Sequence, residues 1–271
     1  LAEILFGFIQ RDYLKVAEVH LIAGLVPKNV PINDLAQALR SIGEPIREFD
    51  KIENQSSSDW IKKEIEELNN IKNLEVKTRT SVAAYHGYNY LLARENLTDH
   101  LEKKDKQGKI RQRLLKIRAK KVILATGALE RPLIFNNNDR PGIMLSSAVK
   151  KYADFYGVVS GKKNVFFTNN DSAYESALCL HNKGIKVEAV IDIRESSNSK
   201  IVKAVENVGI KIHWSHTIVD TKGYKRLNSI SAMKLSKDGL SVTGNKIDIS
   251  CDCLGVAGGW TPAVHLFTQS G

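Results

Sequence analysis

The feature of this sequence that most constrains its fold is an alternation of apolar strands and amphipathic helices in its second half. Val165-Phe166-Phe167 has the character of a buried strand, and residues 171–183 have the pattern of an amphipathic helix. A further strand is predicted over residues 186–193, then a helix over 201–208 and a third strand over 211–214. Strands that alternate with helices at this spacing predict a parallel sheet.

Shorter alternating segments lie on both sides of this pattern. Strands are predicted near residues 74–78, 85–94 and 113–118, joined by polar turns, and a second group of strands over 230–249. Three such segments in succession favour an antiparallel meander. The chain is therefore predicted to be of the α/β class, with antiparallel additions.

Each meander is followed by an apolar run that ends in small residues. Residues 120–127 end in Ala125-Thr126-Gly127, and residues 251–259 end in Gly258-Gly259. Small residues at the carboxyl end of a buried strand allow a ligand to approach the backbone at the edge where open α/β sheets bind ligands. The second run suggests that the chain returns to a first domain. A plain glycine turn is the alternative.

The loop after the first strand of the β-α-β pattern is where a dinucleotide fingerprint, G-x-G-x-x-G, is expected. Thr168, Asn170 and Ala173 occupy its three positions. Asn170 would crowd a pyrophosphate and Asp171 would repel it at the start of the helix, while Asp192 lies where a ribose-binding acid is expected. We expect a domain that keeps the fold without tight dinucleotide binding. The alternative is a modified pocket in which polar side chains bind another ligand: Asn169, Asn170 and Ser172.

The net charge of +10 is concentrated in one segment. Residues 101–121 contain ten Lys or Arg residues and two acids. Such a segment could bind anions or nucleic acid, but no aromatic residue interleaves with the charges to stack on bases. We therefore favour a solvated hairpin and predict no nucleic-acid partner.

Cysteine usage and hydropathy suggest a cytoplasmic protein. The three cysteines, Cys179, Cys251 and Cys253, do not form a disulfide framework. A C-x-C pair with no further ligand nearby does not predict a metal site. No run of about 18 apolar residues predicts a membrane span, and no signal peptide is visible.

Four stretches carry a resemblance to the alpha subunits of heterotetrameric sarcosine oxidases. They cover residues 124–135, 138–145, 167–174 and 258–266, with further agreement at 78–82. The resemblance implies a glutathione-reductase-like FAD/NAD(P)-binding architecture. It also implies NAD in the alpha subunit, FAD as a possible alternative, FMN only with a partner, and a beta-like flavin subunit that oxidises an amine substrate. No residue is expected to be catalytic. The dinucleotide site would be lined by Ser81, Val82, Ala125, Thr126, Gly127 and Gly259.

The start of the chain departs from this family. Residues 1–46 have a helical pattern and resemble a helical segment of UbiB/AarF-like atypical kinases, without that family's nucleotide-binding or catalytic motifs. The change near residues 46–51 suggests a joined sequence. The predicted domains are a helical segment of foreign origin over 1–46, an incomplete first dinucleotide-binding domain over 51–145 plus 251–271, and a second such domain over 146–250.

The resemblance implies that the chain is a fragment of a sarcosine-oxidase-like alpha subunit, part of an enzyme that demethylates N-methylglycine. Two alternatives remain open. One is a non-catalytic assembly module without bound cofactor, and the other is an alpha-like subunit of another amine or opine dehydrogenase.

Overall fold

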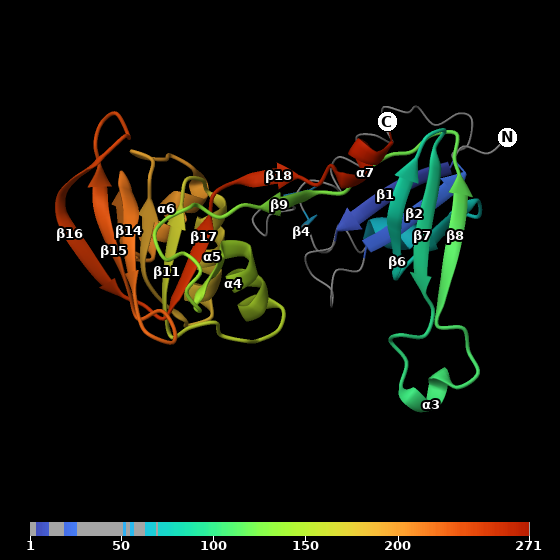
Figure 1. Cartoon of the computed structure of the whole chain (residues 1–271), viewed down its shortest axis with the longest axis horizontal. Helices are drawn as coiled ribbons and strands as arrows, with labels where there is room; N and C mark the ends of the chain where they lie inside the picture. The colour runs from blue at the N-terminus through green and yellow to red at the C-terminus, as the bar shows by residue number, and fades with distance from the viewer. Residues whose placement is uncertain are drawn as a thin grey trace. The chain divides into compact units, whose positions relative to one another are not determined.

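The computed structural model describes residues 4–10, 19–25, 51–52 and 55–56 as backbone, and residues 63–68 and 70–270 in more detail. The chain divides into two compact units (Figure 1). Unit 1 comprises Leu1–Ala128 and Pro262–Gly271, and unit 2 comprises Leu129–Thr261. The chain passes between them in two segments, β9 (Ala128–Glu130) and β18 (Trp260–Pro262), which pair in a two-stranded sheet.

Unit 2 is built on a five-stranded sheet in which every strand pair is parallel. In spatial order the strands are β10 (Ile143–Leu145), β17 (Cys253–Ala257), β11 (Lys163–Thr168), β12 (Lys186–Asp192) and β13 (Ile212–Trp214). The parallel sheet predicted from the alternating pattern is confirmed. The predicted α/β class is confirmed with it.

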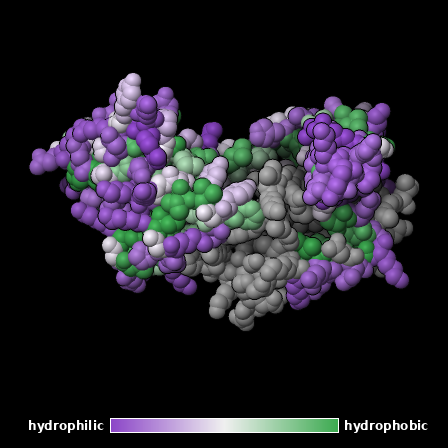
Figure 2. All heavy atoms as spheres, turned by 90° about the horizontal axis from the view of Figure 1, so that it is seen from below, coloured by the Kyte–Doolittle hydropathy of each residue, from purple (hydrophilic) through white to green (hydrophobic). Residues whose placement is uncertain are grey.

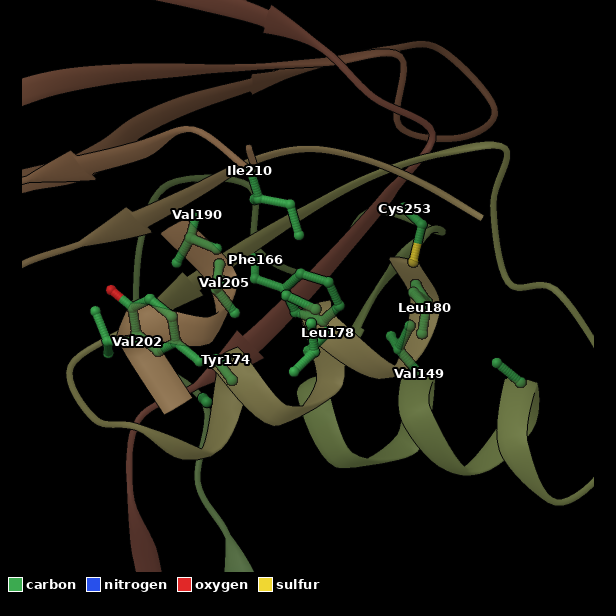
Figure 3. Close-up of a cluster of buried hydrophobic side chains, with 14 residues drawn as sticks. Val149, Phe166, Tyr174, Leu178, Leu180, Val190, Val202, Val205, Ile210 and Cys253 are labelled. Carbon is green, nitrogen blue, oxygen red and sulfur yellow. The ribbon is translucent and has the colours of Figure 1, made fainter. Parts of the chain in front are cut away.

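The two faces of this sheet are buried in different layers because side chains alternate along a strand. Phe166 packs on the helical side, against residues of α4 (Ser146–Asp154), α5 (Ser172–Asn182) and α6 (Lys200–Asn207). Figure 3 shows Phe166 among Tyr174, Leu178 and Leu180 of α5. Its neighbours Val165 and Phe167 pack on the opposite side.

The second face is covered by an antiparallel meander of β14 (His216–Lys222), β15 (Ser229–Leu235) and β16 (Val242–Ser250). Ile218, Ile230 and Ala232 of this meander join Val165 and Phe167 in one buried cluster. This antiparallel meander thus covers one face of the sheet, and three helices cover the other.

The helices end where glycine allows a left-handed backbone. Gly184, after α5, has φ +73°, and Gly209, after α6, has φ +79°. At the other end of α6, Ser199 Oγ accepts a hydrogen bond from the backbone N–H of Val202 at 3.4 Å. The predicted helix ends agree with the structure to within about two residues.

Among its described residues, unit 1 contains two three-stranded antiparallel sheets and the two-stranded pair of β3 (Lys51–Ile52) and β4 (Gln55–Ser56). One three-stranded sheet pairs β1 (Ile4–Gln10), β2 (Val19–Leu25) and β5 (Leu74–Lys77), and the other pairs β6 (Thr80–His86), β7 (Tyr90–Asn96) and β8 (Gln112–Arg118). Its remaining elements are a helix over 63–68, α3 (Lys103–Lys106) and α7 (His265–Gln269).

The helical prediction for residues 1–46 is wrong where the structure describes them. Residues 4–10 and 19–25 form antiparallel strands, and β2 also pairs with β5. Short apolar runs fit a strand as well as a helix, and here pairing with a neighbouring strand decides. The rest of residues 1–46 lies outside the described residues.

Two other strand predictions need correction. The single strand predicted over 85–94 is divided by a turn at residues 87–89, where Tyr88 and Asn89 both have positive φ. Residues 85–86 end β6, and residues 90–94 belong to β7, so the strand prediction holds for the latter. The strand predicted over residues 120–127 does not pair with any strand among the described residues. An apolar run becomes a strand only where another strand offers backbone partners.

The predicted domain boundaries are also displaced. Both β10 and β17 lie in the parallel sheet of unit 2, so that unit begins before residue 146 and ends after residue 250. The run over 251–259 therefore does not return to the first domain but forms the second strand of this sheet. It lies between β10 and β11 because its backbone hydrogen-bonds to both.

The basic segment lies on the hairpin formed by β7 and β8. Arg113 pairs with Glu95 at 2.9 Å and Arg111 with Asp99 at 2.7 Å. β8 is the edge strand of its sheet, and charged side chains on an edge discourage pairing with other chains. Figure 2 shows predominantly hydrophilic residues over much of the visible surface, interrupted by hydrophobic ones. The solvated-hairpin interpretation fits these ion pairs.

Candidate dinucleotide sites

The loop between β11 and α5, at the carboxyl edge of the unit 2 sheet, is held by its own polar side chains. Asn170 Oδ1 accepts hydrogen bonds from Ser172 N at 3.0 Å and Ser172 Oγ at 2.6 Å. Asn170 Nδ2 donates to the Ala257 carbonyl of β17 at 3.2 Å. Thr168 Oγ1 donates to the Asn170 carbonyl at 2.8 Å and accepts from its N–H at 3.0 Å. The loop is therefore hydrogen-bonded without any ligand.

The end of the neighbouring strand β12 carries a buried carboxylate that is fully engaged. Asp192 has no exposed surface. Its Oδ2 accepts from the Tyr174 hydroxyl at 2.7 Å and from Arg194 Nη2 at 2.8 Å, and its Oδ1 accepts from Arg194 N at 2.9 Å. Burial, reinforced by the hydrogen bond to Asp192, raises the pKa of Tyr174 far above its usual value. Tyr174 is therefore a neutral donor.

Arg194 links this carboxylate to the start of α5. Its Nη1 lies 2.8 Å from Asp171 Oδ1, and its guanidinium carbon lies 6.0 Å from the centre of the Tyr174 ring. Burial disfavours the charge on Asp171, but hydrogen bonds from Arg194 and Ser199 outweigh it and hold the pKa of that carboxyl below its usual range. The negative charge expected to repel a pyrophosphate is thus paired with a cation.

These residues do not fit a bound dinucleotide. Side chains stand at the two positions where the fingerprint needs glycine, Thr168 and Asn170, and both are used in the loop's own hydrogen bonds. Asp192, the acid expected to bind a ribose hydroxyl, has neither exposed surface nor an unengaged oxygen. The sequence pattern drew attention to Thr168, Asn170 and Asp192 but not to Arg194. An arginine two residues after the strand's last acid was the signal for it.

Five of the six residues predicted to line a dinucleotide site lie in unit 1. Gly127, in the run 121–127, has φ +67° and accepts a hydrogen bond from Ala263 N at 2.9 Å. Thr126 Oγ1 donates to the Ala263 carbonyl at 2.5 Å, and Ala125 precedes it. Val82, on β6 next to Ser81, packs against the same buried cluster as Leu124. The structure therefore gathers β6 and the 121–127 run in one unit.

The sixth residue, Gly259, belongs to unit 2. Its carbonyl accepts a hydrogen bond from Arg131 N at 2.8 Å, and Gly258 N donates to the Arg131 carbonyl at 2.6 Å. A Cβ built on Gly258 would lie 2.8 Å from the backbone of Arg131 and Pro132. Close packing of two backbone segments therefore accounts for glycine at position 258. This explanation resembles the alternative of a structural glycine turn more than a strand end that a ligand approaches.

Glu130 is a buried acid that the sequence did not single out. Its Oε2 accepts hydrogen bonds from Ser147 N at 2.9 Å and Ser147 Oγ at 2.5 Å, at the amino end of α4. Burial raises the pKa of this carboxyl, although the two bonds from Ser147 oppose the shift. A carboxylate at this end of a helix satisfies free N–H groups, so its main role is to hold α4.

Within the described part of the chain, no three His, Cys, Asp or Glu side chains come together as a metal site would require. No helix there has the length and apolar character needed to cross a bilayer.

No family model matches the chain. The chain is 37% identical over 222 residues to the sarcosine oxidase subunit alpha of Corynebacterium sp. (strain P-1). The match covers 81% of this chain and 22% of that protein. It spans about a fifth of the length of the sarcosine oxidase alpha subunits that it matches.

A second, shorter similarity is to a different protein. Over 48 residues the chain is 46% identical to a probable protein kinase UbiB of Pseudomonas putida, which covers 18% of this chain and 9% of that protein. Both resemblances inferred from the sequence are confirmed.

Among solved structures, the L-proline dehydrogenase from P. horikoshii matches with a TM-score of 0.52 and 20% identity. The match covers 84% of this chain and 36% of that one. It supports the fold.

Proposed function

We propose that this chain is a segment of an alpha-like subunit in an amine-oxidising oxidoreductase related to sarcosine oxidase. The observation that carries the proposal is the 37% identity over 222 residues to a sarcosine oxidase alpha subunit. In the proposed assembly, a beta-like partner subunit carries the flavin, including any FMN, and oxidises the amine. No described residue of this chain is assigned a catalytic role.

The proposed position of NAD is unit 1, with FAD as the alternative ligand there. The site would be lined by Ser81, Val82, Ala125, Thr126 and Gly127. Gly259, the sixth residue of the predicted site, belongs to unit 2 and is not part of the proposed site. Two observations support unit 1: its run of small residues contains a left-handed glycine at position 127, and the corresponding loop of unit 2 does not fit a dinucleotide. When bound, NAD would supply a nicotinamide ring, and these residues would hold its backbone by close contact.

The isolated chain is expected to bind NAD or FAD weakly. The Thr126 hydroxyl is already hydrogen-bonded to the Ala263 carbonyl, and residues 121–127 have no ladder partner among the described residues. The test is absorbance and mass spectrometry of the purified chain. Stoichiometric NAD or flavin that stays bound through purification would contradict this expectation.

The oxidoreductase proposal is tested on the complete complex. The alpha-like protein that contains this segment is co-expressed with its flavin subunit, and amine-dependent reduction of the flavin is measured with N-methylglycine and with other secondary amines. We expect N-methylglycine to be oxidised. Reduction by an opine or another amine instead would favour the rival dehydrogenase, and no reduction by any amine would reject the proposal.

A non-catalytic assembly module is the second candidate, and the closed loop of unit 2 favours it. A domain whose ligand loop is satisfied by its own side chains can serve as a rigid docking partner. Co-purification with a flavin subunit whose activity is the same with and without this segment would select this function. A cytoplasmic location is proposed for either function, supported by three buried free cysteines.

A further inference from the structure

We propose that Asn170 and Arg194 occupy the positions of the nucleotide in unit 2, so that this domain is ordered without a ligand and rejects dinucleotides. Asn170 would replace a phosphate oxygen, and Arg194 would replace the ribose hydroxyls. The inference concerns unit 2 alone and holds whether or not the proposed oxidoreductase function is correct.

The phosphate half of the proposal rests on the amino end of α5. In dinucleotide-binding domains a phosphate accepts hydrogen bonds from N–H groups at this end of the helix. Here Asn170 Oδ1 accepts from the N–H of Ser172, the first residue of α5, at 3.0 Å. The same amide donates to the Ala257 carbonyl at 3.2 Å. One side chain therefore satisfies the helix and ties it to the neighbouring strand β17.

The ribose half rests on the acid at the end of β12. In dinucleotide-binding domains this acid accepts hydrogen bonds from ribose hydroxyls. Here Asp192 accepts instead from Arg194 and Tyr174, and none of its surface is exposed. A ribose could reach Asp192 only if Arg194 left its position.

Arginine is suited to this role because its planar fork can serve two carboxylates at once. Nη2 lies 2.8 Å from Asp192 and Nη1 lies 2.8 Å from Asp171. The guanidinium also lies over the ring of Tyr174, which stacks on Trp214 with 6.2 Å between ring centres. Arg194 is therefore a positioning residue that joins the loop after β12 to the start of α5.

The stability test compares Arg194→Ala with Arg194→Lys and with Arg226→Ala. Arg226 is a matched control in the same unit, with one hydrogen bond to the Asp252 carbonyl. Loss of Arg194 leaves Asp192 buried without its cation, so we expect the melting temperature to fall by about 6 °C or more. Lysine should restore part of the loss, and the control should change little. An Arg194→Ala melting temperature equal to wild type would overturn the proposal.

The pH dependence separates a charge role from simple packing. Burial disfavours the charge on Asp171, but hydrogen bonds from Arg194 and Ser199 outweigh it and lower the pKa of that carboxyl, with Ser197 as a further partner. This contribution to stability is complete above the unfolded pKa of about 3.9 and is lost as pH falls through the folded value. The loss of melting temperature in Arg194→Ala should therefore shrink as pH falls from about 6 towards about 3. A loss that is constant over this range would mean that Arg194 acts by packing alone, against the proposal.

The exclusion test measures NADH binding by fluorescence in a background carrying Gly127→Val, which disables the proposed site in unit 1. With unit 2 unchanged, we expect no saturable binding up to the highest NADH concentration used. In the triple variant Thr168→Gly/Asn170→Gly/Arg194→Ala, we expect saturable binding with a Kd at least about tenfold below that concentration. If the triple variant does not fold, the single variant Asn170→Gly is tested in its place, and a smaller gain in NADH affinity is expected. A folded variant without any gain would count against the proposal. So would wild-type binding that Arg194→Ala weakens tenfold.

Discussion

Two apolar runs are alike in sequence and different in structure. Residues 121–127 of unit 1 end in Gly127, and β17 of unit 2 is followed directly by Gly258-Gly259. β17 is fully buried and is hydrogen-bonded to β10 on one side and β11 on the other. Residues 122–127 are only partly buried and belong to no ladder among the described residues. The comparison shows that a strand is made by its neighbours as much as by its own residues.

The same difference extends to the proposed ligand sites. Unit 2 has a complete parallel sheet, yet Asn170 is hydrogen-bonded within the loop after β11, and Arg194 is paired with the acid at the end of β12. Unit 1 keeps small residues at its candidate site but holds them in an unladdered segment. The better-formed fold is thus the poorer candidate for cofactor binding, so overall architecture alone does not assign a site.

The largest expected difference between the two runs is in hydrogen exchange. Amides of β17 should exchange only through global opening of unit 2, which for a domain costs about 5–15 kcal/mol. Amides of residues 122–127 should exchange through local opening at far lower cost, because backbone ladder bonds do not hold them. Mass spectrometry of deuterated fragments measures both. Equal protection of the two runs would remove the basis of the comparison.

A matched pair of leucines gives the next largest difference. Leu254 in β17 has no exposed surface, whereas Leu124 is partly exposed. Leu254→Ala should lower the free energy of unfolding by about 2–5 kcal/mol, because it empties space in a closed core. Leu124→Ala should cost about 1 kcal/mol or less. Urea unfolding measures both values, and a larger loss for Leu124 would contradict the structure.

The smallest expected effect is a pH dependence of stability that arises from Glu130, the last residue of β9. Burial raises the pKa of Glu130, so the folded state favours its protonated form. The resulting contribution to stability is complete below the unfolded pKa of about 4.3 and is lost as pH rises through the folded value.

Glu130→Gln removes this titration and keeps an oxygen that can accept from Ser147. Its stability relative to wild type should therefore improve with rising pH, by a margin of about 1 kcal/mol. Glu206→Gln, at an exposed position of α6, is the control. Melting temperatures across the pH range measure the slope, and parallel curves for wild type and Glu130→Gln would refute the assignment.

The sequence allowed the architecture of unit 2 to be predicted because each local signal agreed with the sheet. Apolar runs such as Val165-Phe166-Phe167 were of strand length, and Gly184 and Gly209 marked the helix ends. The place of β17 between β10 and β11 was not predictable. Strand order depends on contacts between residues far apart in the chain, which periodicity does not encode.

The candidate sites were predictable in part for a similar reason. The fingerprint positions Thr168 and Asn170 followed from their spacing after β11, but the hydrogen bonds that fill the loop depend on Ala257, far along the chain. Arg194 and Glu130 escaped notice because each partner lies on another element. The strands over 4–10 and 19–25 were missed because their apolar pattern fits a helix as well.

The pairing of β9 with β18 places the first and last segments of unit 2 beside each other. Arg131 exchanges hydrogen bonds with Gly258 and Gly259, so the ends of residues 129–261 are fastened within the unit itself. A domain whose two ends lie side by side can be inserted between two neighbouring residues of another domain without moving them far apart. Unit 2 thus has the geometry of an insertable module, one that could be removed, exchanged or circularly permuted while its five-stranded sheet stays intact.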